Sequence, residues 1–220
     1  MSTITPFPSA QGADMAAASP APGAAFLRAM ARAKASAVRA GQLAPAFHLN
    51  SLDGEAVALI DLVGRGPLVL SFYRGVWCDF CGSALQRLSE IDPEIRASGA
   101  RQIAIGPSVP ADQRAPLAAL GFPVLADHGL KIASAYGLTA TVPPEDRARH
   151  LGAGFMPDAG WRVCIPATYI IDPLGRVVMA AIDVDYRNRL DAGEILATLR
   201  AMHGRHAAFV PIRAKRARTS

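Results

Sequence analysis

Two cysteines separated by two residues, Cys78 and Cys81, are the side chains of this sequence best suited to covalent chemistry. Two thiols at this spacing can close a disulfide and reopen it. They follow an apolar, β-like run at 67–73 and precede the run 83–91, whose apolar residues recur at helical spacing. The pair is therefore expected at a strand-to-helix junction, where the helix dipole and unpaired backbone N–H groups favour a thiolate. The N-terminal thiol, Cys78, is the predicted nucleophile.

Metal binding is the main alternative for such a pair. Zinc ribbons add a second Cys-x-x-Cys or a histidine pair, and the sequence has neither at a suitable place. Among the five histidines only His203 and His206 have the spacing of metal ligands, and they lie near the chain end without an acidic neighbour. All five are therefore expected on the surface. The sequence predicts no metal and no bound cofactor.

A third cysteine, Cys164, lies far from the pair in the sequence. It is a resolving thiol, a third metal ligand beside a histidine, or a buried and unreactive thiol. The last of these is favoured, because free cysteines are among the most buried residue types.

Length and composition indicate one domain with ragged ends. A chain of 220 residues, 51% of them hydrophobic, can bury one sizeable core. No run of about 18 apolar residues is present, so a membrane-spanning helix is not expected. The first 23 residues contain four prolines and no apolar stretch typical of a secretory signal. Together with the odd number of cysteines, this favours the cytoplasm.

The charge is unevenly distributed, which marks the ends of the chain. The formal net charge is +5, yet residues 41–204 hold 17 acidic and 14 basic side chains. Residues 1–24, rich in Ala, Pro, Ser and Gly, are expected to be disordered. So is the basic tail 205–220; its charges at 213–218 are not interleaved with aromatic residues, so nucleic-acid binding is not expected. Residues 25–40 predict an amphipathic basic helix that packs on its own domain or on a second subunit, which leaves a homodimer open.

Predicted strands alternate with predicted helices in the body 41–204, as in βαβ units on a central sheet. The segment 138–164 is expected to be a long loop that holds one short helix. The predicted strands are 46–49, 56–59, 67–73, 102–105, 122–125 and a hairpin of 167–171 with 177–182; the predicted helices run from the cysteines to about 97 and over 111–120, 129–136, 144–151 and 192–203.

Three blocks of sequence occur in one order along this body: GQLAPAF at 41–47, Phe72-Tyr73 ahead of the cysteines, and IPATYIIDPLG at 165–175. Together they resemble the peroxiredoxin-like branch of the alkyl hydroperoxide reductase C and thiol-specific antioxidant family, over roughly residues 41–202. The resemblance implies a thioredoxin-like α/β sandwich with a central mixed β-sheet flanked by helices. It also implies an oxidoreductase that reduces a small hydroperoxide or a disulfide and is itself reduced by a cellular dithiol of the thioredoxin or glutathione type.

The site departs from the family pattern. The family that this sequence resembles has the pattern Pro-x-x-x-Thr-x-x-Cys at this site. Aligned with this sequence, its reactive cysteine falls on Cys81, its threonine on Cys78 and its proline on Arg74. The arginine of the later strand falls on Pro166, where thioredoxins carry a cis-proline. At two positions, Cys78 and Pro166, the residue typical of a peroxidase is thus replaced by the residue typical of a thioredoxin. We therefore expect disulfide reduction to be favoured over peroxide reduction.

The residues expected near the two cysteines can each be interpreted in more than one way. Arg74 either stabilises a Cys78 thiolate or forms a surface ion pair. Trp77 either shields the thiol or is a core aromatic residue. Pro166, if its peptide bond with Ile165 is cis, exposes backbone that can pair with an extended substrate peptide.

Two catalytic cycles and one non-catalytic role follow. In a disulfide cycle Cys78 attacks and Cys81 resolves the mixed disulfide. In a peroxide cycle Cys81 is oxidised to a sulfenic acid and Cys78 condenses with it. The alternative is a redox sensor or a metal-binding module that uses Cys78, Cys81 and Cys164.

Overall fold

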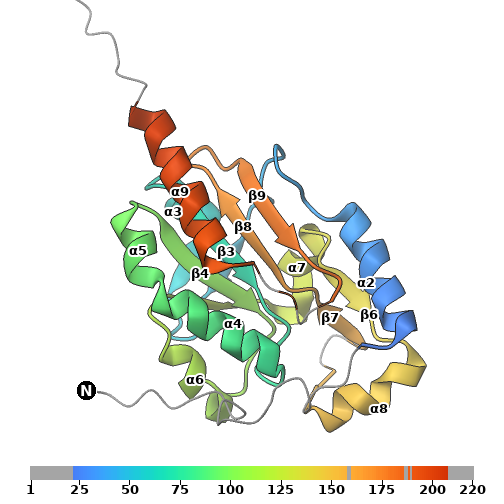
Figure 1. Ribbon diagram of the computed structural model, residues 1–220. Coiled ribbons are helices and arrows are strands. Elements are labelled where there is room, and N and C mark those ends of the chain that lie inside the picture. Colours follow the sequence, from blue (N-terminus) through green and yellow to red (C-terminus); the bar gives the residue numbers. More distant parts are fainter. Residues whose placement is uncertain (1–21, 158–159, 186–187, 189, 208–220) are drawn as a thin grey trace, which may run out of the picture.

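The computed structural model describes residues 22–157, 160–185, 188 and 190–207. Its centre is a five-stranded sheet in the order β5-β4-β3-β8-β9 (Figure 1). β3 runs parallel to β4, β4 runs parallel to β5, and the hairpin of β8 and β9 joins β3 antiparallel. The central mixed sheet that the sequence predicts is confirmed. The strands are β3 (Leu68–Phe72), β4 (Arg101–Gly106), β5 (Val124–Ala126), β8 (Ala167–Ile171) and β9 (Val177–Ile182).

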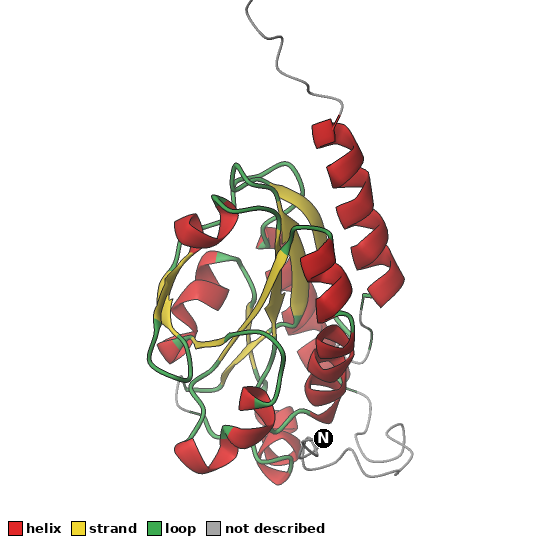
Figure 2. Cartoon of the chain, turned by 90° about the vertical axis from the view of Figure 1, so that its left-hand side faces the viewer, coloured by secondary structure: helices red, strands yellow, loops and turns green. Residues whose placement is uncertain are grey.

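Alternation along the strands gives the sheet two apolar faces, each covered by helices (Figure 2). On one face Val69 and Ile170 pack with side chains of α5 (Asp92–Ala97) and α9 (Ala192–Ala207). On the other face Leu68 and Leu70 belong to a larger core, and this core also includes residues of α2 (Ala24–Ser36) and α7 (Lys131–Ala135). Because both faces are covered, every residue of β3 is buried.

The helix that follows the cysteines is two helices rather than one. α4 spans Asp79–Glu90, Ile91 separates it from α5, and α5 begins at Asp92 with Pro93 in its first turn. Proline has no N–H to donate and clashes with the preceding turn, so it starts a new helix instead of continuing the old one. The single helix predicted from the cysteines to about residue 97 is wrong at this point.

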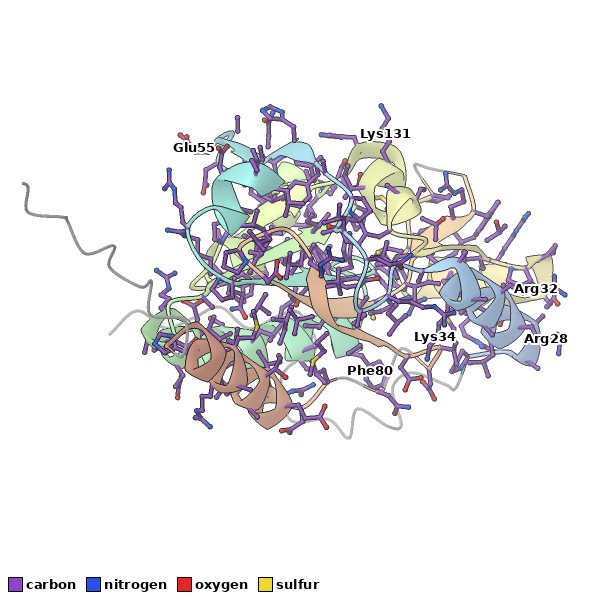
Figure 3. The ribbon with its side chains drawn as sticks, turned by 90° about the horizontal axis from the view of Figure 1, so that it is seen from above. Arg28, Arg32, Lys34, Glu55, Phe80 and Lys131 are labelled. Atoms are coloured by element: carbon purple, nitrogen blue, oxygen red, sulfur yellow. The ribbon has the colours of Figure 1, made fainter. Side chains whose placement is uncertain are left out.

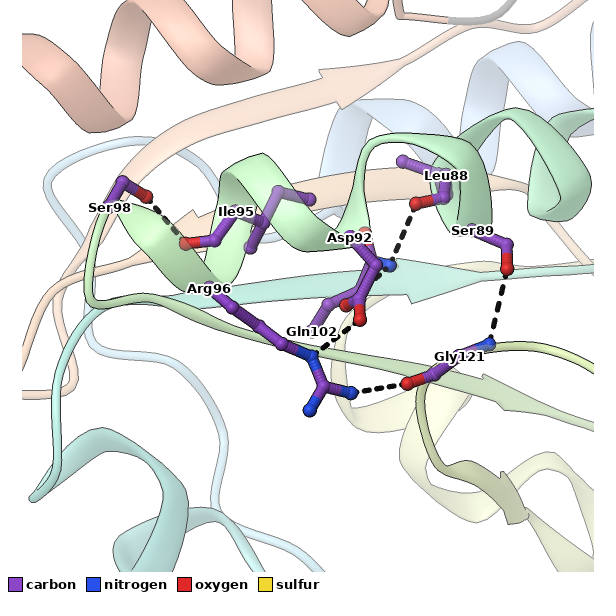
Figure 4. Close-up of polar contacts among 8 residues, drawn as sticks. All are labelled: Leu88, Ser89, Asp92, Ile95, Arg96, Ser98, Gln102 and Gly121. Carbon is purple, nitrogen blue, oxygen red and sulfur yellow. Dashed lines mark hydrogen bonds and ion pairs between the residues drawn. The ribbon is translucent and has the colours of Figure 1, made fainter.

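A polar cluster ties this junction to the sheet (Figure 4). The buried carboxylate of Asp92 accepts hydrogen bonds from Arg96 at 2.5 Å and from Gln102 of β4 at 3.4 Å. The Gln102 amide also donates to the carbonyl of Leu88 in α4 at 3.1 Å, and Arg96 donates to the carbonyl of Gly121. These bonds attach the end of α4 and the start of α5 to β4 of the sheet.

The segment before β8 is more ordered than a loop. The predicted helix is present as α8 (Pro144–Gly152). Two strands that the sequence does not predict flank it, β6 (Thr139–Thr141) and β7 (Arg162–Cys164), and they pair antiparallel. Three residues are too few to show a recognisable period, and here no turn signal or regular alternation of strands and helices marks the two strands, as it does for the short strands that the sequence predicts.

The predicted N-terminal helix is α2, and it packs on its own domain. It lies beside β6, with Phe26 and Met30 buried (Figure 1). Its basic side chains Arg28, Arg32 and Lys34 are exposed, and Arg28 and Arg32 lie on the outer side of the helix (Figure 3). The segments 1–24 and 205–220 are expected to be disordered. They lie outside the described residues except for 22–24, where α2 begins, and 205–207, the last turn of α9.

The remaining elements are short. The predicted strands 46–49 and 56–59 are present as an antiparallel pair, His48–Asn50 with Ala56–Ala58. The predicted helices over 111–120 and 129–136 are shorter than expected, and each is preceded by a 3-10 turn; in the second turn Gly129 and Leu130 both have positive φ. No helix among the described residues is long and apolar enough to cross a membrane. These elements are β1 (His48–Asn50), β2 (Ala56–Ala58), α3 (Leu59–Val63), η1 (Ala111–Gln113), α6 (Ala115–Ala118) and η2 (His128–Leu130).

Candidate active site

The first turn of α4 carries both cysteines of the pair. Cys78 is the N-cap residue of the helix and Cys81 lies in its first turn, so the predicted strand-to-helix junction is confirmed. Both are free thiols, and both are buried, with 4% of Cys78 and 1% of Cys81 exposed. The positive end of the helix dipole therefore acts on two sulfur atoms that water barely screens.

Arg74 contacts both of these sulfur atoms. Its guanidinium Nη1 donates to Cys78 Sγ over 3.7 Å, and its backbone N–H donates to Cys81 Sγ over 3.4 Å. The residue is only 3% exposed, so the reading as a surface ion pair is wrong. A fixed positive charge this close to a sulfur stabilises the thiolate over the thiol. That Arg74 stabilises a Cys78 thiolate stays a prediction, and the contact between the two side chains is the geometry that it requires.

Trp77 covers the guanidinium of Arg74. The ring centroid lies 4.5 Å from Arg74 Cζ, and the ring meets Phe155 edge-on at 5.4 Å. Gly75 has φ of 147°, and a Cβ atom there would collide with the Trp77 indole. Only glycine allows the ring to fold back over the loop in this way. Trp77 is thus half-buried, packing on the core and keeping water from Arg74.

A histidine that the sequence predicts on the surface is part of this site. His150 of α8 is 5% exposed, and its Nε2 lies 3.0 Å from Arg74 Nη2. Burial lowers the pKa of His150, and the charges of Arg74 and Arg149 act in the same direction, against the hydrogen bond and charge of Asp146. A single histidine in a polar helix carries no signal of burial, because neighbouring elements cover it: Phe26 of α2 meets its ring at 4.9 Å.

Cys164 has a different environment. It lies in β7, is 1% exposed, and its thiol donates to the carbonyl of Ile165 over 3.5 Å. Burial raises the pKa of the Cys164 thiol far above its usual value, the charge of Asp127 raises it further, and Arg74 offsets only part of the rise. The thiol is therefore neutral, in agreement with the reading as a buried, unreactive cysteine. In the described part of the chain no three or more His, Cys, Asp or Glu side chains are arranged to hold a metal ion.

Pro166 lies beside the cysteines, but its peptide bond is trans. The register that pairs Phe72 with Ala167 puts Pro166 next to the end of β3. The backbone pairing with a substrate peptide that the sequence suggests requires a cis Ile165–Pro166 bond, and this bond is not cis. Pro166 nevertheless lines the same cavity as Cys81, a space of about 450 Å³ bounded by α4, β8 and β9 and by the start of α9.

A second cavity, of about 340 Å³, lies on the other side of the cysteine loop. Arg74, Trp77 and Cys164 line it, together with apolar side chains such as Val109 and Phe155. The first cavity is more polar, with Asp183, Asp191 and Glu194 in its wall. The predicted site residues are thus brought together around one loop, with a space on either side of it.

Comparisons with known proteins point to one family. Residues 40–180 match the model of the AhpC/TSA family. The thiol-disulfide oxidoreductase ResA of Halalkalibacterium halodurans is 31% identical over 106 residues, which cover 47% of this chain and 59% of that protein. ResA of Bacillus thuringiensis is 27% identical over 154 residues, which cover 69% of this chain and 74% of that protein. The match to the first of these relatives thus spans little more than half of its length.

Solved structures share the fold. The peroxidoxin BcpB from Mycobacterium tuberculosis superposes with a TM-score of 0.59 at 19% identity, covering 75% of this chain and 98% of that one. A yeast mitochondrial 1-Cys peroxiredoxin gives a TM-score of 0.60 at 15% identity, covering 82% and 84%. The fold is therefore the expected thioredoxin-like α/β sandwich. Because the family match spans most of the chain and includes the cysteine loop and the β8–β9 hairpin, the chain belongs to the AhpC/TSA family.

Proposed function

We propose that this chain is a thiol-dependent oxidoreductase that reduces disulfides through the Cys78 and Cys81 couple. The observation that carries the proposal is the guanidinium of Arg74 at 3.7 Å from Cys78 Sγ, at the N-terminus of α4. A cation and a helix terminus directed at one sulfur favour its thiolate, which is the form that attacks a disulfide. The relatives named thiol-disulfide oxidoreductases support the same assignment.

The cycle transfers two electrons from the protein dithiol to the substrate. The Cys78 thiolate attacks one sulfur of the substrate disulfide, the S–S bond breaks, and the released thiolate takes up a proton. Cys81 then loses its proton and attacks the Cys78 sulfur of the mixed disulfide. This step frees the second substrate thiol and closes a Cys78–Cys81 disulfide. A cellular dithiol of the thioredoxin or glutathione type returns the couple to its reduced state.

Peroxide reduction at Cys81 is the second candidate, and the larger cavity favours it. Cys81 lines that cavity, and the backbone N–H of Arg74 donates to its sulfur. The side-chain donors of a peroxidase are replaced, however, since Cys78 and Pro166 stand where the resemblance puts threonine and arginine. Each lost donor costs about two to three orders of magnitude in rate where it stabilises a developing charge. We therefore expect slow peroxide turnover.

Stopped-flow rates for a model disulfide and for hydrogen peroxide test the proposal. On the disulfide mechanism, Cys78→Ser is inactive and Cys81→Ser accumulates a mixed disulfide. Mass mapping of the oxidised wild-type protein should then find a Cys78–Cys81 bridge. If Cys78→Ser still forms a sulfenic acid rapidly at Cys81, while Cys81→Ser does not react with peroxide, the protein is a peroxidase instead.

A non-catalytic metal module makes a different prediction. It requires stoichiometric zinc or iron in protein purified under reducing conditions, whereas we expect none bound to the Cys78 and Cys81 pair.

Three free thiols in one chain also fit a reducing compartment, and we propose that the protein acts in the cytoplasm.

A further inference from the structure

The imidazole of His150 has its two nitrogens committed to different partners. Arginine side chains only donate hydrogen bonds, so His150 Nε2, at 3.0 Å from Arg74 Nη2, must be the unprotonated acceptor. The proton is then on Nδ1, which donates to the carbonyl of Asp146 at 2.9 Å. The contacts therefore select one neutral tautomer of the ring.

The protein holds this ring rigidly. Apolar rings surround it: Phe26 of α2 at 4.9 Å, Trp77 at 5.8 Å and Phe155 at 5.9 Å. The start of α2 is anchored on the same helix, because Gly23 lies so close to the buried carboxylate of Asp146 that a Cβ atom there would collide with it. The acceptor for Arg74 is thus fixed by packing from three directions.

Protonation of the ring is incompatible with this arrangement. A proton on Nε2 would place two donors face to face, and two positive charges 3.0 Å apart. The charged groups that face the ring are Arg74 from the loop after β3 and Asp146 and Arg149 from α8, and Asp146 is already paired with Arg149 at 3.1 Å. The Arg74–His150 contact therefore exists only while the imidazole is neutral.

We propose that His150 is a positioning residue, which holds the Arg74 guanidinium toward the sulfur of Cys78 only while its imidazole is neutral. The path has two steps, from His150 Nε2 to Arg74 Nη2 and from Arg74 Nη1 to Cys78 Sγ. Loss of the acceptor releases one end of the guanidinium and weakens the charge that stabilises the thiolate. The inference rests on Arg74 acting at Cys78, as in the proposed function.

The test measures the ionisation of Cys78 in the full chain with Cys81→Ser and Cys164→Ser, which leaves Cys78 as the single thiol. His150→Leu removes the acceptor and keeps an apolar filling of the space. His150→Gln keeps an amide oxygen that can accept from Arg74 but cannot be charged. We expect His150→Leu to reduce the thiolate fraction at pH 7 about three- to tenfold, and His150→Gln to stay within about twofold of the parent.

The pH profile of alkylation gives a second signature. In the parent, the rate at acid pH should fall more steeply than one ionisation allows, because protonation of His150 adds to that of Cys78. In His150→Gln the slope should be that of a single ionisation. His48→Gln, an exposed histidine of β1, is the matched control and should follow the parent.

Three results would overturn the inference. The first is an unchanged Cys78 pKa in His150→Leu at an unchanged thermal midpoint. The second is an equal loss of thiolate in the Leu and Gln variants, which would mean that ring packing matters rather than the acceptor. The third needs no variant, namely NMR spectra of the wild-type protein that show the proton of His150 on Nε2. Because these readouts follow ionisation and not turnover, they remain valid even if the substrate proves to be a peroxide.

Discussion

The first turn of α4 and the strand β7 both hold cysteines that are almost completely buried. Cys78 and Cys164 are 4% and 1% exposed, so exposure does not distinguish them. The groups around them do: Cys78 faces a guanidinium at a helix N-terminus, whereas Cys164 donates to a backbone carbonyl and lies in the field of Asp127. We therefore expect the reactivity of these buried thiols to be set by the charges that face them.

Alkylation of the native, reduced protein is the strongest test of this contrast. Iodoacetamide at pH 7 should label Cys78, whose thiolate is stabilised by Arg74, much faster than Cys164, which is a neutral thiol. Because only the thiolate is alkylated and the pKa of Cys164 is raised far above its usual value, we expect labelling to differ by about a thousandfold or more. Peptide mass analysis over a time course measures both rates in one sample. Similar rates at the two cysteines would contradict the comparison.

Arg74→Gln should bring the two environments closer together. Without the guanidinium, the Cys78 thiolate loses a positive charge 3.7 Å away, and alkylation at pH 7 should slow by about ten- to a hundredfold. Arg162→Gln is the matched control, because this arginine lies in β7 and lines the second cavity. It should leave the rate at Cys78 within about twofold of wild type. The thermal midpoints of both variants check that the fold is retained.

Cys164→Ala addresses the other side of the contrast. If the thiol only fills space, the substitution removes one buried atom and costs about 1 kcal/mol of unfolding free energy. The rate of disulfide reduction should not change. Urea unfolding and stopped-flow kinetics measure the two quantities. A loss of turnover without a loss of stability would show that Cys164 takes part in the cycle.

The parts of the fold that the sequence predicts correctly are those that depend on local patterns. The junction of β3 and α4 and the hairpin of β8 and β9 follow from local periods and turn residues, and they lie where the sequence predicts them. The pair Cys78 and Cys81 and its neighbour Arg74 could be chosen as site residues because their positions follow from that junction.

The unpredicted parts depend on contacts between distant segments. Burial of Arg74 could not be foreseen, since arginine is almost never fully buried without partners, and the partner His150 lies 76 positions further along the chain. The strands β6 and β7 exist because they pair with each other, and α2 packs beside β6. Sequence reasoning selects a candidate nucleophile, and only the fold provides the groups that surround it.

The smallest expected effect is a pH dependence of stability that comes from His150. Its pKa is lowered in the folded state, so at pH above its usual value of 6.5 the ring is neutral in both states and contributes no pH dependence. As the pH falls below 6.5, the unfolded chain binds a proton that the folded protein resists, and the free energy of unfolding decreases until the folded pKa is passed. Between pH 7 and 5.5 this loss should reach up to about 1 kcal/mol in wild type.

Urea unfolding at both pH values measures this loss of unfolding free energy. His150→Gln should remove the loss, whereas His48→Gln should retain it. An equal loss in wild type and His150→Gln would mean that the imidazole takes up its proton as readily in the folded protein as in the unfolded chain, and that Arg74 is held toward Cys78 without a neutral His150.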